Sequence, residues 1–275
     1  MCPETSAPTL WAPRTTALRV VGAGASHVGH RRASNQDVFI VEPELGLYAV
    51  LDGMGGTNSG DAAARIAGSA LISSVRQHGT AAHDAPGAPD LLETALDAAA
   101  RAVFVSAASS EEYKGMGTTA VACRFIAPRR LVLGHAGDSR AYLLRGERFE
   151  MLTLDHTVAQ ELVTAGRLTA EEAEQWPGKH VLTRNLGDTN GVQPAMRVLE
   201  LEPEDRLLLC SDGLHGELPD GVIRDMLGSS DAPIVIAHRF IEAVLDGAAR
   251  DNVTAVVLAA EPPATSASGS AAPPS

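Results

Sequence analysis

Apolar residues along this chain follow two spacings, and each spacing predicts a different kind of element. Short apolar runs that end in polar or glycine-containing turns are typical of strands. Such runs predict strands at residues 17–26, 38–41, 46–51, 119–126, 131–135, 139–144, 196–201, 206–210 and 253–259. Longer stretches place apolar residues on one face at helical spacing. They predict a helix that starts at an N-cap among residues 57–59 and runs to about residue 77, further helices at residues 90–109, 219–227 and 234–245, and mainly short helices across 157–190.

The order of these elements favours an α+β fold, because runs of strands and pairs of helices do not alternate as they do in a doubly wound sheet. Thr169, followed by Glu residues, is a typical helix cap. The ends of the chain, residues 1–17 and 261–275, are rich in Pro, Thr, Ala and Ser. We expect these two tails to be disordered and residues 18–260 to form one folded domain.

Composition narrows the choice of partners and compartment. The 275 residues carry a formal net charge of −12, which disfavours nucleic acid or an anionic membrane as the main partner. Three cysteines are too few for a disulfide framework. No apolar run approaches the length of a membrane span, and the N-terminus lacks the basic start and hydrophobic core of a signal peptide. We expect a cytoplasmic monomer without a membrane anchor.

Three aspartates stand at the ends of separate predicted strands. Asp52 follows one strand and precedes Gly53, whose missing Cβ lets a backbone carbonyl approach a cation closely. Asp212 follows a second strand, and Asp251 precedes a third. A buried carboxylate needs a compensating charge, and Mg²⁺ and Mn²⁺ prefer oxygen ligands. One Asp-Gly pair alone would be a hairpin turn, but three such carboxylates predict a hydrolytic site for divalent cations.

Two further segments carry residues suited to phosphate chemistry. An Arg of the Arg31–Arg32 pair can bind phosphate oxygens with two parallel hydrogen bonds, and Asp37 can join the cation site. The alternative for the Arg31–Arg32 pair is a solvated basic loop. Asp138 lies in a Gly-Asp pair between two short predicted strands, and from the spacing alone a simple hairpin turn is as well supported as a functional role.

The motifs and their order resemble those of the metal-dependent Ser/Thr protein phosphatases, the PPM or type-2C family. The matching motifs are Arg-x-x-Asn-x-Asp from Arg32, Asp-Gly-Met-Gly-Gly from Asp52, Gly-Met-Gly-Thr-Thr from Gly115, Gly-Asp-Ser-Arg from Gly137, Ser-Asp-Gly from Ser211 and Asp-Asn-Val-Thr from Asp251. Met54, in place of a His that many eukaryotic members carry, resembles the bacterial branch. The motifs cover most of the chain.

This resemblance implies a β-sandwich flanked by antiparallel helix pairs, with the metal centre in a cleft at one end of the sandwich. Two Mn²⁺ or Mg²⁺ ions, with a possible third, would be the cofactors. Asp52 would bridge two ions, with the Gly53 carbonyl on one of them. Asp212 and Asp251 would complete the other, and Asp37 would hold metal-bound water.

The resemblance also assigns roles around the two ions. Arg32 would bind the substrate phosphate, and Asp138 with Asp212 would match the weaker third site of bacterial members. The segment between His156 and Gly191 would form a flap beside the cleft. Several flap residues could contact a phosphoprotein or could equally be a solvated surface: Arg167, Lys179, His180, Arg184 and Asn185.

Two departures from the family pattern bear on the chemistry. Gln36 stands where many members have Glu, which removes one carboxylate from the surroundings of the second ion. Met54 cannot donate a proton to the leaving oxygen. His156 is a conceivable substitute, although a single His is more often structural.

The sequence therefore predicts an enzyme, a Mn²⁺- or Mg²⁺-dependent protein Ser/Thr phosphatase with Asp37, Asp52 and Asp212 as catalytic residues. A metal-bound hydroxide would attack the phosphorus of phosphoserine or phosphothreonine directly. The substrates would be phosphorylated proteins of bacterial Ser/Thr kinase signalling. Two alternatives are a catalytically inactive binding module of the same fold and a metal-dependent phosphodiesterase. The complete acidic set counts against the first, and the acidic composition counts against the second.

Overall fold

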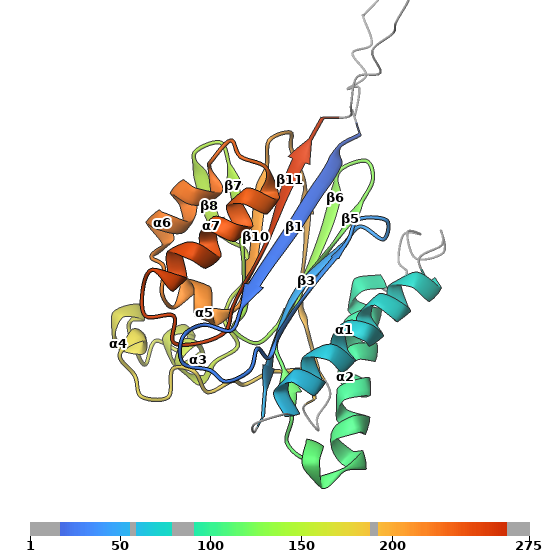
Figure 1. Ribbon diagram of the computed structural model, residues 1–275, viewed down its shortest axis with the longest axis vertical. Helices are drawn as coiled ribbons and strands as arrows, with labels where there is room; N and C mark the ends of the chain where they lie inside the picture. Colours follow the sequence, from blue (N-terminus) through green and yellow to red (C-terminus); the bar gives the residue numbers. More distant parts are fainter. Residues whose placement is uncertain (1–16, 56–58, 79–90, 188–191, 263–275) are drawn as a thin grey trace, which may run out of the picture.

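The computed structural model describes residues 17–55, 59–78, 91–187 and 192–262, and two antiparallel sheets packed face to face form its centre (Figure 1). The five-stranded sheet has the order β1 (Arg19–His27), β11 (Val253–Glu261), β10 (Arg206–Cys210), β7 (Arg140–Arg145) and β8 (Arg148–Met151). The six-stranded sheet has the order β2 (Asp37–Glu42), β3 (Leu47–Met54), β5 (Ala120–Ile126), β6 (Arg130–Ala136) and β9 (Ala195–Glu200), with the short β4 (Gly117–Thr118) paired to β3.

Helices cover the outer faces of both sheets (Figure 1). The long pair α1 (Ser59–His78) and α2 (Leu91–Ser109) packs on the six-stranded sheet, and α7 (Pro233–Leu245) with α6 (Asp220–Leu227) packs on the five-stranded sheet. The shorter helices are α3 (Val158–Thr164), α4 (Ala170–Glu174), α5 (Asp212–His215) and a 3₁₀ turn, η1 (Glu111–Tyr113). In the described part of the chain, no helix combines the length and the apolar composition that a membrane span requires.

Strands in the middle of the sandwich are apolar without interruption because both of their faces are covered. Along β3, Tyr48 and Val50 lie in the apolar cluster between the sheets. Leu47, Ala49 and Leu51 lie in the cluster under α1 and α2. Successive side chains of a strand point to opposite faces, so both sets must be apolar. A carboxylate directly after such a strand is therefore placed at the rim of an apolar core.

The α+β class and the helix-flanked sandwich predicted from the sequence are confirmed. Thr169 caps α4 with a complete capping box, in which Glu172 returns a hydrogen bond to the Thr169 backbone. Two strands were not predicted. β4 has two residues, and β8 is a short edge strand whose side chains are half exposed, so neither carries an apolar period.

The predicted tails, 1–17 and 261–275, lie almost wholly outside the described residues. Of the second tail, Glu261 still belongs to β11, where it pairs with Arg19 of β1. The domain limits 18–260 therefore stay a prediction, with the last strand extending one residue beyond them.

Antiparallel pairing brings distant parts of the sequence to one end of the sandwich. Asp37 at the start of β2 is the direct register partner of Asp52 near the end of β3. The end of β10 and the start of β11 meet in the same way, with Cys210 opposite Ala255. The turn from β6 to β7 reaches the same end (Figure 1). The predicted acidic residues thus collect at this end, between the edges of the two sheets.

Candidate metal centre

Asp37 is held by hydroxyl groups from the opposite sheet. Its side chain is buried, and its Oδ2 accepts hydrogen bonds from Ser211 Oγ at 2.8 Å and Thr254 Oγ1 at 2.7 Å. Because the Thr254 proton goes to Asp37, Ser26 Oγ donates to Thr254 at 2.7 Å, and Asn35 Nδ2 donates to Ser26 at 2.8 Å. Asp37 Oδ1 is buried and has no hydrogen-bond partner among the described residues. One oxygen is therefore fixed and the other is free to bind an ion or a water.

Asp212 and Asp251 approach from the five-stranded sheet. Asp212 is the first residue of α5, two residues after the end of β10, and its buried Oδ1 also has no hydrogen-bond partner among the described residues. Asp251 precedes β11; its Oδ1 accepts from the Asn252 N–H at 2.8 Å, and its Oδ2 accepts from Arg32 Nη2 at 2.6 Å. These contacts leave Asp212 more open than Asp251 to a cation.

Arg32 compensates Asp251, but no ion pair between described residues compensates Asp37, Asp52 or Asp212. Burial, with a smaller contribution from the neighbouring carboxylates Asp212 and Asp251, raises the pKa of Asp37 to about 7. Burial, followed by the charges of Asp37 and Asp212, raises the pKa of Asp52 well above its ordinary value. Burial and Asp251 also raise the pKa of Asp212. Groups that repel one another in a low dielectric need either protons or a cation. The unpartnered oxygens, the carboxylate donors and the excess of negative charge together fit the binding of divalent metal ions.

Gly53 marks a close approach between β3 and the start of α1. A Cβ on Gly53 would lie 2.1 Å from the backbone oxygen of Gly60 and 2.8 Å from that of Gln36. The Gly53 N–H donates to the same Gln36 oxygen at 3.2 Å. No other residue fits here, which supplies a physical reason for the glycine after Asp52. A role of the Gly53 carbonyl as a metal ligand stays a prediction.

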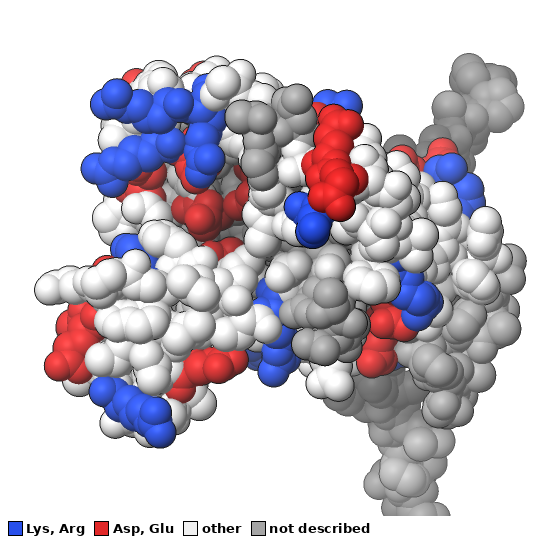
Figure 2. Space-filling view, turned by 90° about the horizontal axis from the view of Figure 1, so that it is seen from below, with Lys and Arg blue, Asp and Glu red and all other residues white. Residues whose placement is uncertain are grey.

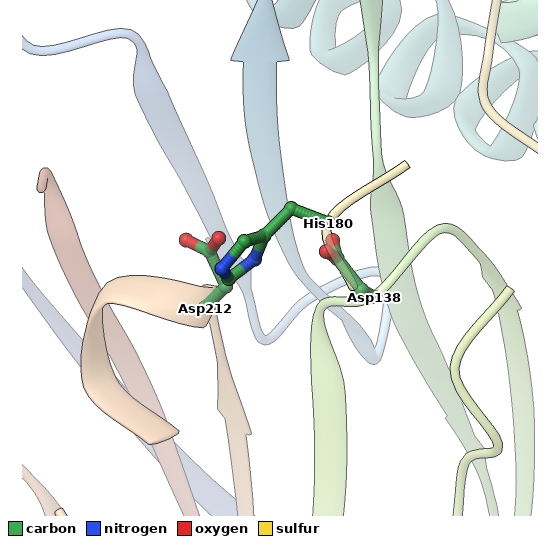
Figure 3. A group of neighbouring side chains, drawn as sticks. All are labelled: Asp138, His180 and Asp212. Atoms are coloured by element: carbon green, nitrogen blue, oxygen red, sulfur yellow. The ribbon is translucent and has the colours of Figure 1, made fainter. Parts of the chain in front are cut away.

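Asp138 lies in the turn between β6 and β7 and points towards Asp212 (Figure 3). Burial, together with the charges of Asp212 and Asp155, raises its pKa to about 7. The backbone oxygen of Asp138 accepts a hydrogen bond from His215 Nε2 at 3.0 Å. A simple hairpin aspartate would be solvated, so the buried position supports the functional interpretation of Asp138 over the turn alternative.

Arg32 stands at the rim of this end. Its guanidinium is half exposed and forms the ion pair with Asp251. Figure 2, which looks at this end, shows a hollow with acidic atoms inside it and basic side chains along one edge. Asn252 holds the Arg32 loop in place, donating to the backbone oxygens of Val28 and Ser34 and accepting from the Gln36 N–H. Phosphate binding by Arg32 stays a prediction.

His156 does not fit the role of a proton donor. Its ring stacks on that of His135, with centroids 4.5 Å apart, and its Nδ1 faces the Gly137 N–H at 3.3 Å. Burial and the neighbouring His135 lower the pKa of His156 to about 4, so the imidazole is neutral near pH 7. Its backbone also bonds to Gly137 and Thr183. These are the contacts of a structural histidine that links the Asp138 turn to the flap.

Sequence reasoning missed three supporting residues, Ser211, Thr254 and Asn252. Ser211 and Thr254 fix Asp37 by hydrogen bonds, and Asn252 fixes the Arg32 loop. Their signal was present: each is a polar residue inside or beside an apolar run and next to a candidate aspartate. It also missed that His180 lies beside Asp138 and Asp212, which the spacing in sequence could not reveal.

Comparison with known proteins identifies the family. The sequence model of the protein phosphatase 2C family matches residues 23–251. The Ser/Thr protein phosphatase PstP of Mycobacterium tuberculosis is 40% identical over 242 residues, which are 86% of this chain and 44% of that protein. The Ser/Thr phosphatase stp of Listeria innocua is 32% identical over 84% of this chain and 91% of its own length. The chain thus spans less than half of the PstP sequence but nearly all of stp.

A solved structure agrees with the sequence matches. The catalytic domain of PstP in complex with two manganese ions superposes with a TM-score of 0.77 at 35% identity, covering 89% of this chain and all of that domain. The two ions of that structure agree with the cofactors predicted here. On its sequence, its fold and its acidic centre, the chain belongs to the protein phosphatase 2C family, the PPM family of Ser/Thr protein phosphatases.

Proposed function

We propose that this chain hydrolyses phosphoserine and phosphothreonine in proteins with the help of two Mn²⁺ or Mg²⁺ ions. The observation that carries the proposal is the meeting of Asp37, Asp52, Asp212 and Asp251 at one end of the sandwich. Two of them keep a buried oxygen without a hydrogen-bond partner among the described residues. An inactive binding module would have no reason to keep carboxylates that repel one another.

The residues divide between ion binding and substrate binding. Asp52 and Gly53 would help to hold the two ions from the six-stranded sheet, and Asp212 and Asp251 would help to hold them from the five-stranded sheet. When bound, the ions would lower the pKa of a water and offset the charge of the phosphate. The protein's contribution is to hold these oxygens in fixed positions and to orient both reactants.

Asp37 and Arg32 are the two residues that would act directly on the reactants. The hydroxyls of Ser211 and Thr254 fix one oxygen of Asp37, and its other oxygen can hold and orient the attacking water. Arg32 would bind two phosphate oxygens and stabilise the charge that spreads over them in a loose transition state. Its ion pair with Asp251 keeps the guanidinium over the centre before substrate arrives.

We also propose the setting in which the chain acts: phosphoproteins made by Ser/Thr kinases as substrates, a monomer as the active form, and the cytoplasm as the compartment. All proposed ligands come from one chain, which supports a monomer. The net charge of −12 disfavours nucleic acid as a substrate. Cys123 and Cys210 are free and buried, as is common for proteins of reducing compartments.

Phosphate release from phosphoserine and phosphothreonine peptides tests the proposal. We expect turnover with Mn²⁺ that is abolished by EDTA and restored by added Mn²⁺. Bis-p-nitrophenyl phosphate, a diester, serves as the comparison substrate. Turnover of the diester in preference to the phosphopeptides would favour the phosphodiesterase alternative, and absence of turnover on both would favour the binding module.

A further inference from the structure

A histidine of the flap, His180, lies beside two carboxylates, Asp138 and Asp212. One ligand atom each of Asp138, His180 and Asp212 lie within 4.8 Å of one another. Figure 3 shows the imidazole of His180 between the two carboxylates. Asp138 comes from the β6–β7 turn, Asp212 from the start of α5, and His180 from the turn after α4. Three separate elements therefore meet at one point.

The position of His180 is set by the backbone around it. The N–H of the next residue, Val181, donates to the Gly178 oxygen at 3.0 Å, and the Val181 oxygen accepts from the Val158 N–H at 2.9 Å. A Cβ on Gly178 would lie 2.5 Å from the Trp176 ring, so the turn closes tightly against that side chain. Backbone hydrogen bonds and packing therefore hold the turn that bears His180, although the His180 side chain is exposed.

The described Lys and Arg side chains around these three groups pair with other carboxylates and not with Asp138 or Asp212. A cavity of about 200 Å³ separates the flap from the sandwich here. Of the charged residues that line it, Arg140 pairs with Asp155, and Lys179 lies 3.6 Å from Glu174. In the described ranges, neither Asp138 nor Asp212 has an ion pair with Lys or Arg. Asp212 also keeps its buried, unpartnered oxygen.

We propose that His180 is a nitrogen ligand to an ion held by Asp138 and Asp212, so that this ion fastens the flap to the sandwich. The other proposed ligands of the centre are all oxygens, and Mg²⁺ prefers such donors. Imidazole suits Mn²⁺ and later transition metals better than Mg²⁺. The site therefore selects Mn²⁺ over Mg²⁺ more strongly than the rest of the centre does. The inference rests on the proposed function only in sharing Asp212 with it.

Pulsed electron paramagnetic resonance of the Mn²⁺-loaded protein, without substrate, tests the ligand directly. Because His180 would be the one nitrogen donor among the proposed ligands, we expect a ¹⁴N coupling to Mn²⁺. This coupling should change to a ¹⁵N coupling when only the histidines are labelled with ¹⁵N. The coupling should vanish in His180→Ala and persist in Lys179→Ala, a neighbouring flap residue whose amine faces Glu174. No coupling in the wild type, or a coupling retained in His180→Ala, would overturn the assignment.

Two binding measurements test the consequences. By isothermal titration, His180→Ala should lower the Mn²⁺ affinity of the weakest site at least about tenfold, with little change for Mg²⁺. By hydrogen exchange, Mn²⁺ should protect the backbone of residues 176–182 in the wild type and in Lys179→Ala but not in His180→Ala. Equal Mn²⁺ affinity and equal protection in His180→Ala would refute the proposal. Its failure would leave phosphopeptide turnover with Mn²⁺ intact, whereas failure of the proposed function would abolish that turnover and leave the nitrogen coupling.

Discussion

At the scale of single residues, the centre depends on buried carboxylates whose negative charges are not offset by ion pairs with the described positive side chains. Asp37 and Asp212 each keep a buried oxygen without a partner in the described part of the chain, while the hydroxyls of Ser211 and Thr254 hold the rest of Asp37 still. Burying a polar atom in this way is unfavourable unless something binds it. Substitutions at these residues should therefore affect the reaction more than the fold.

Asp52→Asn should reduce turnover at least about 10³-fold, comparable to the loss of other preorganised electrostatic contributions. The charge of Asp52 would serve both ions, so its loss weakens two sites at once. Steady-state kinetics on a phosphothreonine peptide with saturating Mn²⁺ measures the effect. Asp225→Asn, which changes an exposed carboxylate on α6, is the matched control and should behave as wild type. Near-normal turnover of Asp52→Asn would remove Asp52 from the centre.

Arg32→Ala should lower kcat/KM for a phosphopeptide roughly 10- to 100-fold, the range expected for charge-assisted hydrogen bonds of about 1.5–3 kcal/mol. Most of the loss should appear in KM, because the contact is with the phosphate itself. Arg32→Lys should recover only part of it, since an ammonium cannot make the two parallel bonds. If Arg31→Ala instead carries the loss, phosphate binding belongs to that neighbour.

At the scale of elements, close packing around glycines decides how the helix pair meets the sheet. The backbone of Gly53 in β3 lies against that of Gly60 in α1, at a distance that leaves no room for a Cβ on either residue. This contact fixes the start of α1 beside the end of β3, where Asp52 lies. The geometry of the centre therefore depends on a packing detail that involves no charged group.

Gly53→Ala should destabilise the protein by roughly 2–4 kcal/mol or prevent its folding, because the new Cβ would meet backbone that cannot rotate away. Gly221→Ala on α6 is the control. A Cβ there meets nothing within 4 Å, and alanine favours helix, so its stability should stay within about 1 kcal/mol of wild type. Urea denaturation of the metal-free proteins measures both. A normal stability of Gly53→Ala would mean that α1 can shift without loss.

The sequence predicted the strands that are buried on both faces, because their apolar runs are continuous. It also predicted that aspartates lie at the ends of these strands, because a carboxylate interrupts each apolar run. It did not predict β8, whose half-exposed residues show no apolar alternation, nor the proximity of His180 to Asp138 and Asp212. This proximity brings a residue of the flap next to turns that are distant in the sequence. Only the packing of the flap on the sandwich determines it.

At the scale of the whole molecule, the acidic end couples metal binding to stability. In the metal-free protein the pKa of Asp37 and of Asp138 is raised to about 7, mainly by burial. Between the ordinary pKa of an aspartate, about 4, and this raised value, the folded protein binds more protons than the unfolded chain. Stability must then fall as the pH rises through this range.

The metal-free protein in EDTA should therefore unfold more easily at pH 8 than at pH 5, by on the order of 1–4 kcal/mol. Saturating Mn²⁺ should remove or reverse this trend, because ions bind the deprotonated carboxylates and stabilise the folded state. Urea denaturation at the two pH values, with EDTA and with Mn²⁺, measures the difference. A metal-free protein that gains stability towards pH 8 would show that these carboxylates are compensated within the protein.

The place of β11 in its sheet has a consequence for how the protein is made. β11 pairs with β1 on one side and β10 on the other, although it is the last strand described in the chain. During synthesis from the N-terminus, the five-stranded sheet lacks this inner strand until residues 253–261 have left the ribosome. Asp251, Asn252 and Thr254, which complete the centre, arrive with it. Under the proposed function, we therefore expect a nascent chain to hydrolyse no phosphopeptide until β11 has been inserted into the sheet.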